Sequence, residues 1–333
     1  MNTLTRLILI FGLILTLCGY ILYYLFSPLP IQRQQSITLA DSTLTSAVSR
    51  LSEAKIIKHP YVFFSIAGLY QLISGKELGI GELSIQPSFT HARMLKLLFA
   101  GESGMTINVV IPEGSDLRKI ASIVQKRIHI DSAAFMKLAN TDSVCRAFGI
   151  KHSSMEGSCM PDTYNMYKQQ QPLDILKKLA VIHQLFWDKR CAELVKQSRY
   201  SKHEILTIAS IVEAEASVAS ERRRISGVYH NRLNMGMKLE ADPTVQYAIG
   251  KRKRLFYSDL KVNSHYNTYR FSGLPPGPIN CPGRESILAA LDPERHGYMF
   301  FVAKGDGSGE HVFSKNGVEH AKAVHAYRKQ RSM

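Results

Sequence analysis

The feature that most limits how this chain can fold is the uncharged apolar segment at residues 7–26, LILIFGLILTLCGYILYYLF. At helical rise a segment of this length spans roughly 30 Å, the thickness of the hydrocarbon core of a bilayer. Tyr20, Tyr23 and Tyr24 gather at one end, as interfacial aromatic residues do. Pro28 then stops the helix. These features predict a transmembrane helix, with the remaining chain folded outside the bilayer.

A cleaved signal peptide is the competing interpretation of this segment. It fits less well, because the apolar stretch is long and no small-x-small cleavage site follows closely. We therefore predict a cytoplasmic tip and single-pass anchor over residues 1–30. The charges beside the segment give only a weak indication of how the helix is oriented in the membrane, since Arg6 precedes it and Arg33 follows it. The short N-terminal tail favours translocation of residues 31–333, which in a bacterium gives an inner-membrane protein with a periplasmic catalytic part.

The charge balance limits the partners. The 333-residue chain has a formal net charge of +15, with lysine and arginine spread along it. This surplus favours nucleic acid, acidic lipid headgroups or an acidic polymer. Nucleic acid is not expected, because basic and aromatic residues do not interleave as in base-stacking proteins. Neither a metal nor another cofactor is predicted, since no Cys/His cluster has ligand spacing.

Cysteine usage leaves two alternatives open. One cysteine lies in the apolar segment, and the others could form two disulfides in an oxidising compartment or remain buried thiols. These other cysteines are Cys145, Cys159, Cys191 and Cys281.

Beyond the anchor, the pattern of elements predicts an α+β protein. Residues 31–58 look polar and helical, and short apolar stretches broken by glycines then precede an amphipathic helix that ends at Gly101. We assign residues 31–101 to a linker and a small α+β module. Residues 102–333 are expected to form a larger α+β domain with a strand at 107–111, many helices, and a final strand–turn–strand–helix.

The segment ILTIASIVE at 205–213 draws attention within this domain. Ser201 and Glu204 form a capping box that predicts a helix start. At 100° per residue, Glu213 falls inside the apolar arc of that helix. A carboxylate in such a place must pair, lie in a cleft or take a raised pKa, and a raised pKa suits a general acid. Glu213 is therefore a candidate catalyst. The alternative is a carboxylate at the edge of the core that reaches water or pairs with an arginine.

Two further carboxylates follow this helix position. Glu215 lies two residues from Glu213 and does not face it, so we expect a supporting neighbour rather than a catalytic pair. Asp242 precedes a proline in an expected turn, where a capping or turn role is the alternative to a role in binding.

A long loop at residues 265–283 carries the residues best suited to a sugar ligand. Adjacent prolines and several glycines predict a rigid, shaped connection. Tyrosine and asparagine supply stacking surface and hydrogen bonds for sugar rings, and long structured loops often bind ligands. The candidate binding residues in it are Tyr266, Asn267, Thr268, Tyr269, Pro276 and Asn280.

Several segments in one order resemble the endolytic murein transglycosylase family, also called YceG-like. The resemblance runs from about residue 60 to the C-terminus and rests on EGSCMPDTY, SIVEAEA, SERRRISGVYHNRL, LEADPTVQYAIG, YNTYRFSGLPPGPI and YMFFVAKGDGSGEHVFSKNGVEHAKAV. The module before PEGSDL is similar to the small LysM-like subdomain of that family. Departures at Met160, His265 and Cys281 bear on substrate preference more than on activity.

The resemblance implies a membrane-anchored bacterial enzyme that cuts nascent peptidoglycan strands internally. Cleavage falls between N-acetylmuramic acid (MurNAc) and N-acetylglucosamine (GlcNAc), leaves 1,6-anhydroMurNAc ends and would terminate strand elongation. The family's catalytic glutamate corresponds to Glu213. Its cleft segments correspond to Asp242–Thr244 and Tyr266–Ile279, which adds Asp242 and Thr244 to the binding residues. Glycan strands are the expected substrate, and cell-wall synthases are further candidate partners.

One carboxylate suffices for this reaction if the muramic acid 6-hydroxyl attacks its own anomeric carbon, because no water need be activated. Ordinary glycosidases use two carboxylates. Two alternatives stay open: a muramidase hydrolase that pairs Glu213 with Asp242, and a membrane-anchored peptidoglycan-binding scaffold without catalysis.

Overall fold

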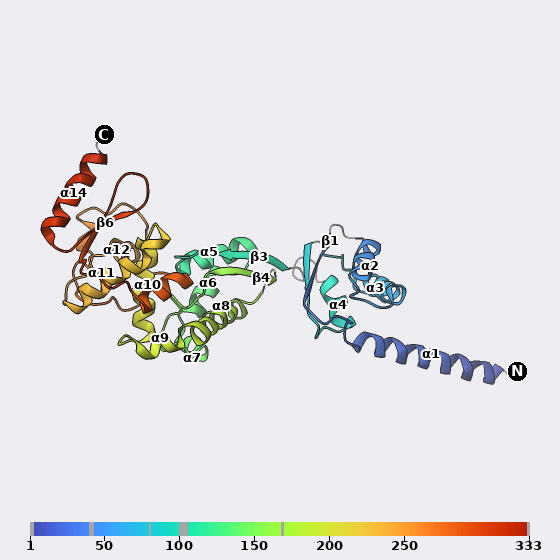
Figure 1. Ribbon diagram of the computed structural model, residues 1–333. Helices are drawn as coiled ribbons and strands as arrows, with labels where there is room; N and C mark the ends of the chain where they lie inside the picture. The colour runs from blue at the N-terminus through green and yellow to red at the C-terminus, as the bar shows by residue number, and fades with distance from the viewer. Residues whose placement is uncertain (1–2, 40–42, 80, 100–105, 168–169, 332–333) are drawn as a thin grey trace. The chain divides into compact units, whose positions relative to one another are not determined.

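The computed structural model describes residues 3–39, 43–79, 81–99, 106–167 and 170–331 (Figure 1). The chain divides into two units. Unit 1 comprises Met1–Val109, Arg127–Ile130 and Tyr164–Gln170. Unit 2 comprises Val110–Lys126, Asp131–Thr163 and Gln171–Met333. The prediction of an α+β protein is confirmed in its mixture of helices and small sheets.

Unit 1 begins with helix α1, Thr3–Phe26, which is long and apolar enough to cross a membrane. Its last turn belongs to a folded core, because Tyr24 is buried in the same apolar cluster as Leu29 and Phe63. The Tyr24 hydroxyl donates to the carbonyl oxygen of His59 at 3.5 Å. The end of the apolar helix is thus part of the folded module rather than a free leader.

The rest of unit 1 differs from the sequence prediction in two places. Residues 31–58 contain strand β1, Gln35–Leu39, as well as helix α2, Leu44–Glu53. The apolar stretches after His59 form one helix, α3, Pro60–Ser74. Glycine is tolerated inside α3 because Phe63 and Ala67 are buried in the core, and packing overrides intrinsic propensity. Both predictions were wrong because the polarity and glycine content of these segments do not indicate which of their side chains are buried.

Strand β2, Gly81–Ile85, pairs antiparallel with β1 from Gln35↔Ile85 to Leu39↔Gly81. Helix α4, His91–Leu98, confirms the predicted amphipathic helix, while its predicted end at Gly101 lies outside the described residues. The sheet continues in the order β1-β2-β3-β4, with β3 at Thr106–Ile111 and β4 at Asp162–Tyr167. Strand β4 lies in the segment EGSCMPDTYNMYK, although its glycine, proline and aspartate are typical of a loop. The LysM likeness of the small module stays a prediction.

Unit 2 is mainly helical. Its first part contains most of α5, Leu117–Ile128, and then α6, Ser132–Ala139, α7, Asp142–Ala147, and α8, Pro172–Phe186. A π-helical turn at Trp187–Cys191 leads into α9, Ala192–Gln197. After α10, Lys202–Glu215, come α11, Arg222–Asn234, α12, Asp242–Ile249, and α13, Arg284–Leu291. Strands β5, Phe300–Ala303, and β6, His311–Ser314, form a hairpin that precedes α14, Gly317–Arg331, as predicted.

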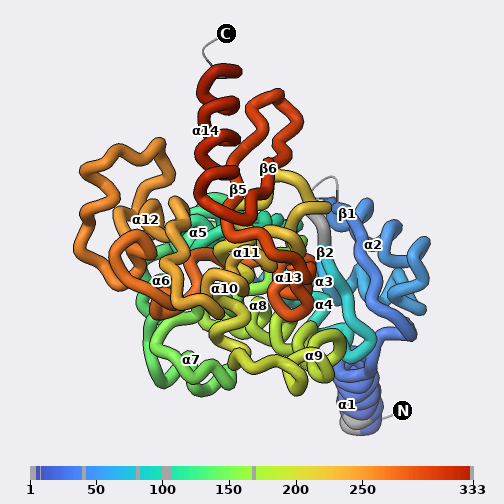
Figure 2. Tube along the Cα trace, turned by 60° about the vertical axis from the view of Figure 1, so that its left-hand side comes forward, coloured from blue at the N-terminus to red at the C-terminus, as the bar shows by residue number. Residues whose placement is uncertain are grey.

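Helix α10 lies at the centre of unit 2, with α11, α12 and α13 around it (Figure 2). The predicted capping box is present, with Ser201 as the N-cap and Glu204 reaching back to it. Every residue from 205 to 212 is buried, so the helix is enclosed on all sides rather than on one face. The buried hydroxyl groups of Thr207 and Ser210 each have a hydrogen-bond partner, because they donate to carbonyl oxygens of the preceding turn.

The cysteines follow the second alternative that the sequence left open. All of them are free, and the four in question are buried: Cys145, Cys159, Cys191 and Cys281.

Candidate active site

Glu213 follows the buried stretch of α10, and its carboxylate has partners on both oxygens. Its side chain is only 8% exposed. The backbone N–H of Gly283 donates to Oε2 at 2.9 Å, and Nη2 of Arg222 lies 3.8 Å from Oε1. The structure therefore places the carboxylate at the edge of the core beside an arginine, in the arrangement that the sequence offered as the alternative to catalysis. Its direct amide contact nevertheless fixes the orientation of the carboxylate.

A second glutamate shares that arginine. Nη2 of Arg222 lies 3.5 Å from Oε2 of Glu113, which belongs to the PEG turn before α5. Burial, and then the negative charge of Glu213, raise the pKa of Glu113, while Arg222 opposes them. Gly114 completes this turn at φ +68°, and a Cβ atom there would lie 3.5 Å from Cγ of Glu213. The turn after β3 is thus packed against the catalytic candidate.

Sequence reasoning did not single out Glu113 or Arg222. The available signals were a turn centred on Gly114, whose conformation favours glycine, and the basic run SERRR. Neither signal says that the two side chains meet at Glu213, because 100 or so residues separate the turn from α10 and only the fold brings them together.

A cleft of about 560 Å³ is lined by Ala214, the residue that follows Glu213, and by Glu113 and Gly114 of the turn packed against Glu213. Its walls are the turn and first residues of α5, Ala214 at the end of α10, and α12 with the residues that follow it. Ile279 and Asn280 of the predicted binding loop complete it. Its basic side chains outnumber its acidic ones: Arg118, Lys119, Lys251 and Arg252 against Glu113 and Asp116. The cleft therefore suits an extended ligand that carries negative charge.

The end of the binding loop follows α10 along its length. Nε2 of His203 donates to the carbonyl oxygen of Pro276 at 2.9 Å. Two turns further along, the hydroxyl oxygen of Ser210 accepts from the backbone N–H of Ile279 at 3.0 Å. The side-chain amide of Asn280 donates to the carbonyl oxygen of Ser210 at 2.8 Å. Together with the contact from Gly283 to Glu213, these bonds bind the loop to the helix from its first turn to its last.

Three predicted binding residues lie inside the loop scaffold. Asn267 is buried, donates to the carbonyl oxygens of Leu260 and Val262 at 2.8 and 2.9 Å, and accepts from the N–H of Tyr269. The buried hydroxyls of Thr268 and Thr244 lie 2.9 Å apart. These bonds join the loop to the start of α12, so the polar atoms of the three residues are engaged within the protein.

Asp242 is the first residue of α12, which corrects the prediction of a turn at this position. The following proline is compatible with the first turn of a helix, because the N–H it lacks has no intrahelical partner there. The hydroxyl of Tyr269 donates to Oδ1 of Asp242 at 2.6 Å. Burial, and then this hydrogen bond, raise the pKa of Tyr269 well above its ordinary value, so the phenol is the donor.

Glu215 belongs to this second group and not to the surroundings of Glu213. It accepts from the hydroxyl of Tyr229 at 3.3 Å. Burial, and then the charge of Asp242, raise the pKa of Glu215 to about 7. Glu213 and Glu215 therefore have separate partners.

Tyr266 contacts a buried carboxyl group through another tyrosine. Its ring centroid lies 4.9 Å from that of Tyr247. The Tyr247 hydroxyl donates to Oε2 of Glu156 at 3.3 Å, and the backbone N–H of Leu117 donates to the same carboxylate at 3.2 and 3.3 Å. Burial raises the pKa of Glu156 to about 7. Glu156 joins α5 to α12 beneath the cleft, and sequence reasoning passed over it although it opens the segment EGSCMPDTY.

This carboxyl group predicts a pH dependence of stability. Because the folded pKa of Glu156, about 7, lies above the ordinary 4.5, the folded state holds the proton more tightly than the unfolded state. The contribution of Glu156 to the free energy of unfolding should be constant below about pH 4.5, fall as the pH rises to about 7, and then level off. We expect Glu156→Gln to remove roughly 2–3 kcal/mol of this fall. Urea unfolding at pH 5 and 7.5, followed by the fluorescence of Trp187, would measure it. Equal falls in both proteins would contradict the assignment.

Among the described residues, no group of three or more His, Cys, Asp or Glu side chains is placed to hold a metal ion.

Known proteins are similar to this chain over most of its length. Residues 39–326 match the model of the YceG-like family. A protein of Bacillus subtilis strain 168 named endolytic murein transglycosylase is 31% identical over 319 residues, which cover 90% of this chain and 87% of that protein. A protein of the same name from Streptococcus pneumoniae D39 is 26% identical, and the match spans 95% of this chain but 63% of the longer pneumococcal protein. The crystal structure of a YceG-like protein from Listeria monocytogenes is similar, with a TM-score of 0.61, 29% identity, and coverage of 88% of this chain and 99% of that one.

Proposed function

Because the chain belongs to the YceG-like family, we propose that it is an endolytic lytic transglycosylase of peptidoglycan. It cleaves the bond between MurNAc and GlcNAc within nascent glycan strands, leaves 1,6-anhydroMurNAc ends and so terminates elongation. The shared name of the relatives from Bacillus and Streptococcus supports the activity. The observation that carries the mechanism is the oriented carboxylate of Glu213, held by the N–H of Gly283 beside the basic cleft.

In this mechanism Glu213 is the single acid/base. Its carboxylic acid protonates the glycosidic oxygen as the bond from that oxygen to C1 of MurNAc breaks. The resulting carboxylate accepts the proton of the MurNAc 6-hydroxyl as O6 attacks C1. The proton count balances, since the carboxyl group ends the cycle protonated again, and no water is consumed. The hydrogen bond from Gly283 holds one oxygen, Oε2, which leaves Oε1 as the atom that exchanges the proton.

Arg222 and Glu113 are proposed to support this group. Nη2 of Arg222 lies 3.8 Å from Oε1 of Glu213 and 3.5 Å from Oε2 of Glu113, so one guanidinium contacts both carboxylates. This shared contact is proposed to hold the Glu213 side chain in position for proton transfer.

The predicted binding residues are proposed to position the strand in two ways. Asn280 lines the cleft, Pro276 lies beside the first turn of α10, and Tyr266 packs against Tyr247 of α12. Asp242 and Tyr269 form a hydrogen-bonded pair at the start of α12. Thr244, Asn267 and Thr268 act on the substrate through the loop, because their polar atoms hold it in place. The basic side chains of the cleft suit glycan strands with peptide carboxylates.

The products of digestion test the proposal against a two-carboxylate hydrolase. We expect purified glycan strands treated with the full chain to yield 1,6-anhydroMurNAc ends by mass spectrometry, 18 Da lighter than reducing ends by the loss of one water. In such a hydrolase Glu113 could be the second carboxylate, because it lies beside the same arginine, Arg222, as Glu213. Reducing MurNAc ends would reject the transglycosylase, and unchanged strands would favour a binding scaffold.

We also propose that α1 anchors the enzyme in the bacterial inner membrane as a single-pass helix, with residues 31–333 in the periplasm. The length and composition of α1 suit a span. The burial of Tyr24 in the core of unit 1 supports retention of the helix, since cleavage behind it would remove a core side chain. Residues 1–30 form the anchor, 31–101 the small module and 102–333 the catalytic domain, and cell-wall synthases at the same membrane are candidate partners.

A further inference from the structure

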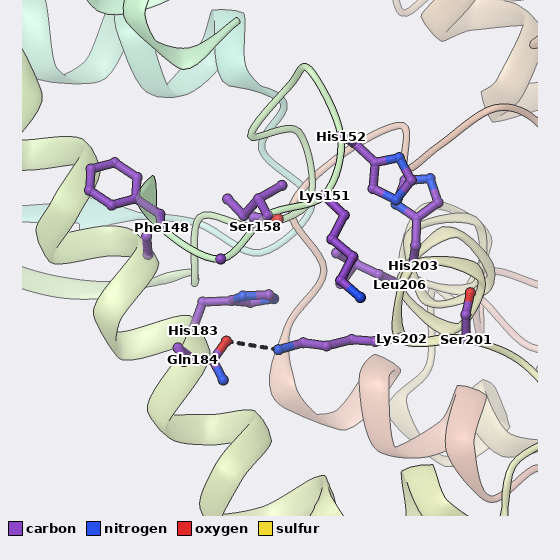
Figure 3. A pocket seen from close by; sticks show the side chains of 13 residues that line it. Phe148, Lys151, His152, Ser158, His183, Gln184, Ser201, Lys202, His203 and Leu206 are labelled. Carbon is purple, nitrogen blue, oxygen red and sulfur yellow. Dashed lines mark hydrogen bonds between the residues drawn. The ribbon is translucent and has the colours of Figure 1, made fainter. Parts of the chain in front are cut away.

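A second pocket opens at the other end of the helix that carries Glu213. It has a volume of about 340 Å³ and is lined by the segment after α7, by α8 and by the first turn of α10 (Figure 3). Phe148, Ala180 and Leu206 contribute apolar surface. No carboxylate is among the described residues that line it. The mechanism proposed above does not use this pocket.

Two lysines give the pocket its charge. Figure 3 shows Lys151 and Lys202 entering it from different segments, with their ammonium groups directed toward the same region. Within the described part of the chain, neither ammonium forms an ion pair. Nζ of Lys202 donates to Oε1 of Gln184 at 3.0 Å and lies 4.8 Å from the ring centroid of Trp187. These contacts hold the ammonium in position without neutralising it.

His183 and His152 supply surface rather than further charge beside the lysines. Nε2 of His183 accepts from the indole N–H of Trp187 at 2.9 Å, and burial lowers the pKa of His183 to about 3, so this ring is neutral. The rings of His152 and His203 stack with their centroids 3.4 Å apart, and burial lowers the pKa of His152. Stacked imidazoles and apolar walls beside two unpaired ammonium groups favour a ligand with both aliphatic and anionic parts.

We infer that this pocket binds a carboxylate of an acidic peptide attached to the glycan strand. The lysines pair with the carboxylate, and Phe148 and Leu206 contact the aliphatic part of the peptide. The ammonium groups of Lys151 and Lys202 can pair with a carboxylate or a phosphate, and the apolar walls favour a carboxylate that belongs to a peptide over free phosphate. The identity of this ligand rests on the proposed function, because a murein strand is the source of such peptides.

The position of the pocket fits a peptide that starts at the cleavage site. His203 lies ten residues before Glu213 on α10, which is roughly 15 Å at helical rise. An extended peptide of about five residues covers a similar length. The loop that runs beside α10 joins the two places, since His203 donates to Pro276 while Gly283 donates to Glu213. The distance between Glu213 and the pocket is therefore within the reach of a peptide of this length.

The first test measures binding without catalysis. Fluorescence anisotropy of the full chain in detergent micelles would compare a labelled acidic peptide with the same peptide in which every carboxylate is a carboxamide. We expect the carboxamide to bind about tenfold more weakly, and Lys151→Gln or Lys202→Gln to weaken binding of the acidic peptide by a similar factor. Lys189→Gln, an exposed lysine outside the pocket, is the matched control and should change nothing. Equal binding of the two peptides, or tighter binding of inorganic phosphate, would overturn the inference.

The second test uses cleavage. With peptide-bearing strands, the two lysine variants should raise KM about tenfold and leave kcat within twofold. With strands stripped of peptides by an amidase, they should match the wild-type protein. If they slow both substrates equally, the pocket has no role in peptide recognition. Failure of the proposed function looks different, because no strand would be cut while the anisotropy experiment could still distinguish the two peptides.

Discussion

The Glu213→Gln variant is expected to cleave glycan strands at least about a thousandfold more slowly than the wild-type protein, while its melting temperature stays within a few degrees. An amide can neither protonate the leaving oxygen nor accept the proton of the 6-hydroxyl, and general acid–base catalysis contributes effects of this size. The side-chain oxygen of glutamine can still accept from the N–H of Gly283, so the local geometry should persist. Quantifying 1,6-anhydroMurNAc ends by mass spectrometry would measure the rate.

Glu215→Gln is the matched control on the same helix. Its carboxyl group contacts Tyr229 rather than the surroundings of Glu213, so we expect a loss of tenfold or less. Glu113→Gln provides a further comparison, because a two-carboxylate hydrolase would require it as strictly as Glu213. If the control on Glu215 lost as much activity as the variant of Glu213, the assignment of the single acid/base would be wrong.

The parts of the fold predicted from sequence are those specified by local signals. The capping box of Ser201 and Glu204 located the start of α10 to the residue, and the terminal hairpin and helix followed their turn residues. The errors came where burial overrode local composition. The segment 35–39 became a strand because it pairs with β2, and the glycine-broken stretch after His59 became α3 because its buried face supplies core side chains.

The candidate site was predictable only in part, for a related reason. Glu213 could be found because a carboxylate in an apolar arc conflicts with its surroundings. Its partners Glu113 and Arg222 carry no such conflict in sequence, since both look like ordinary surface charges. Asn267 was difficult to interpret for the opposite reason. Its polar side chain in a loop suited to sugars predicted a contact with the ligand, but its amide donates to carbonyl oxygens of the protein and stabilises the loop. Sequence gives the hydrogen-bonding capacity of a side chain, and the fold decides where that capacity is used.

Gly157→Ala is expected to destabilise unit 2 by about 3 kcal/mol. The variant tests how closely the EGSCMPDTY segment packs against the binding loop and α10. Gly157 has φ +78°, and a Cβ atom there would lie 2.6 Å from Pro278 and 3.1 Å from Leu206 of α10. The left-handed backbone costs an alanine roughly 1–2 kcal/mol, and the overlap adds roughly 1–3 kcal/mol because Pro278 is rigid. Gly149→Ala is the control, since its φ is +73° with nothing within 4 Å. Urea unfolding followed by Trp187 fluorescence should give about 1 kcal/mol for the control. Equal losses would mean that the packing of the EGSCMPDTY segment on the loop contributes nothing to stability beyond its backbone conformation.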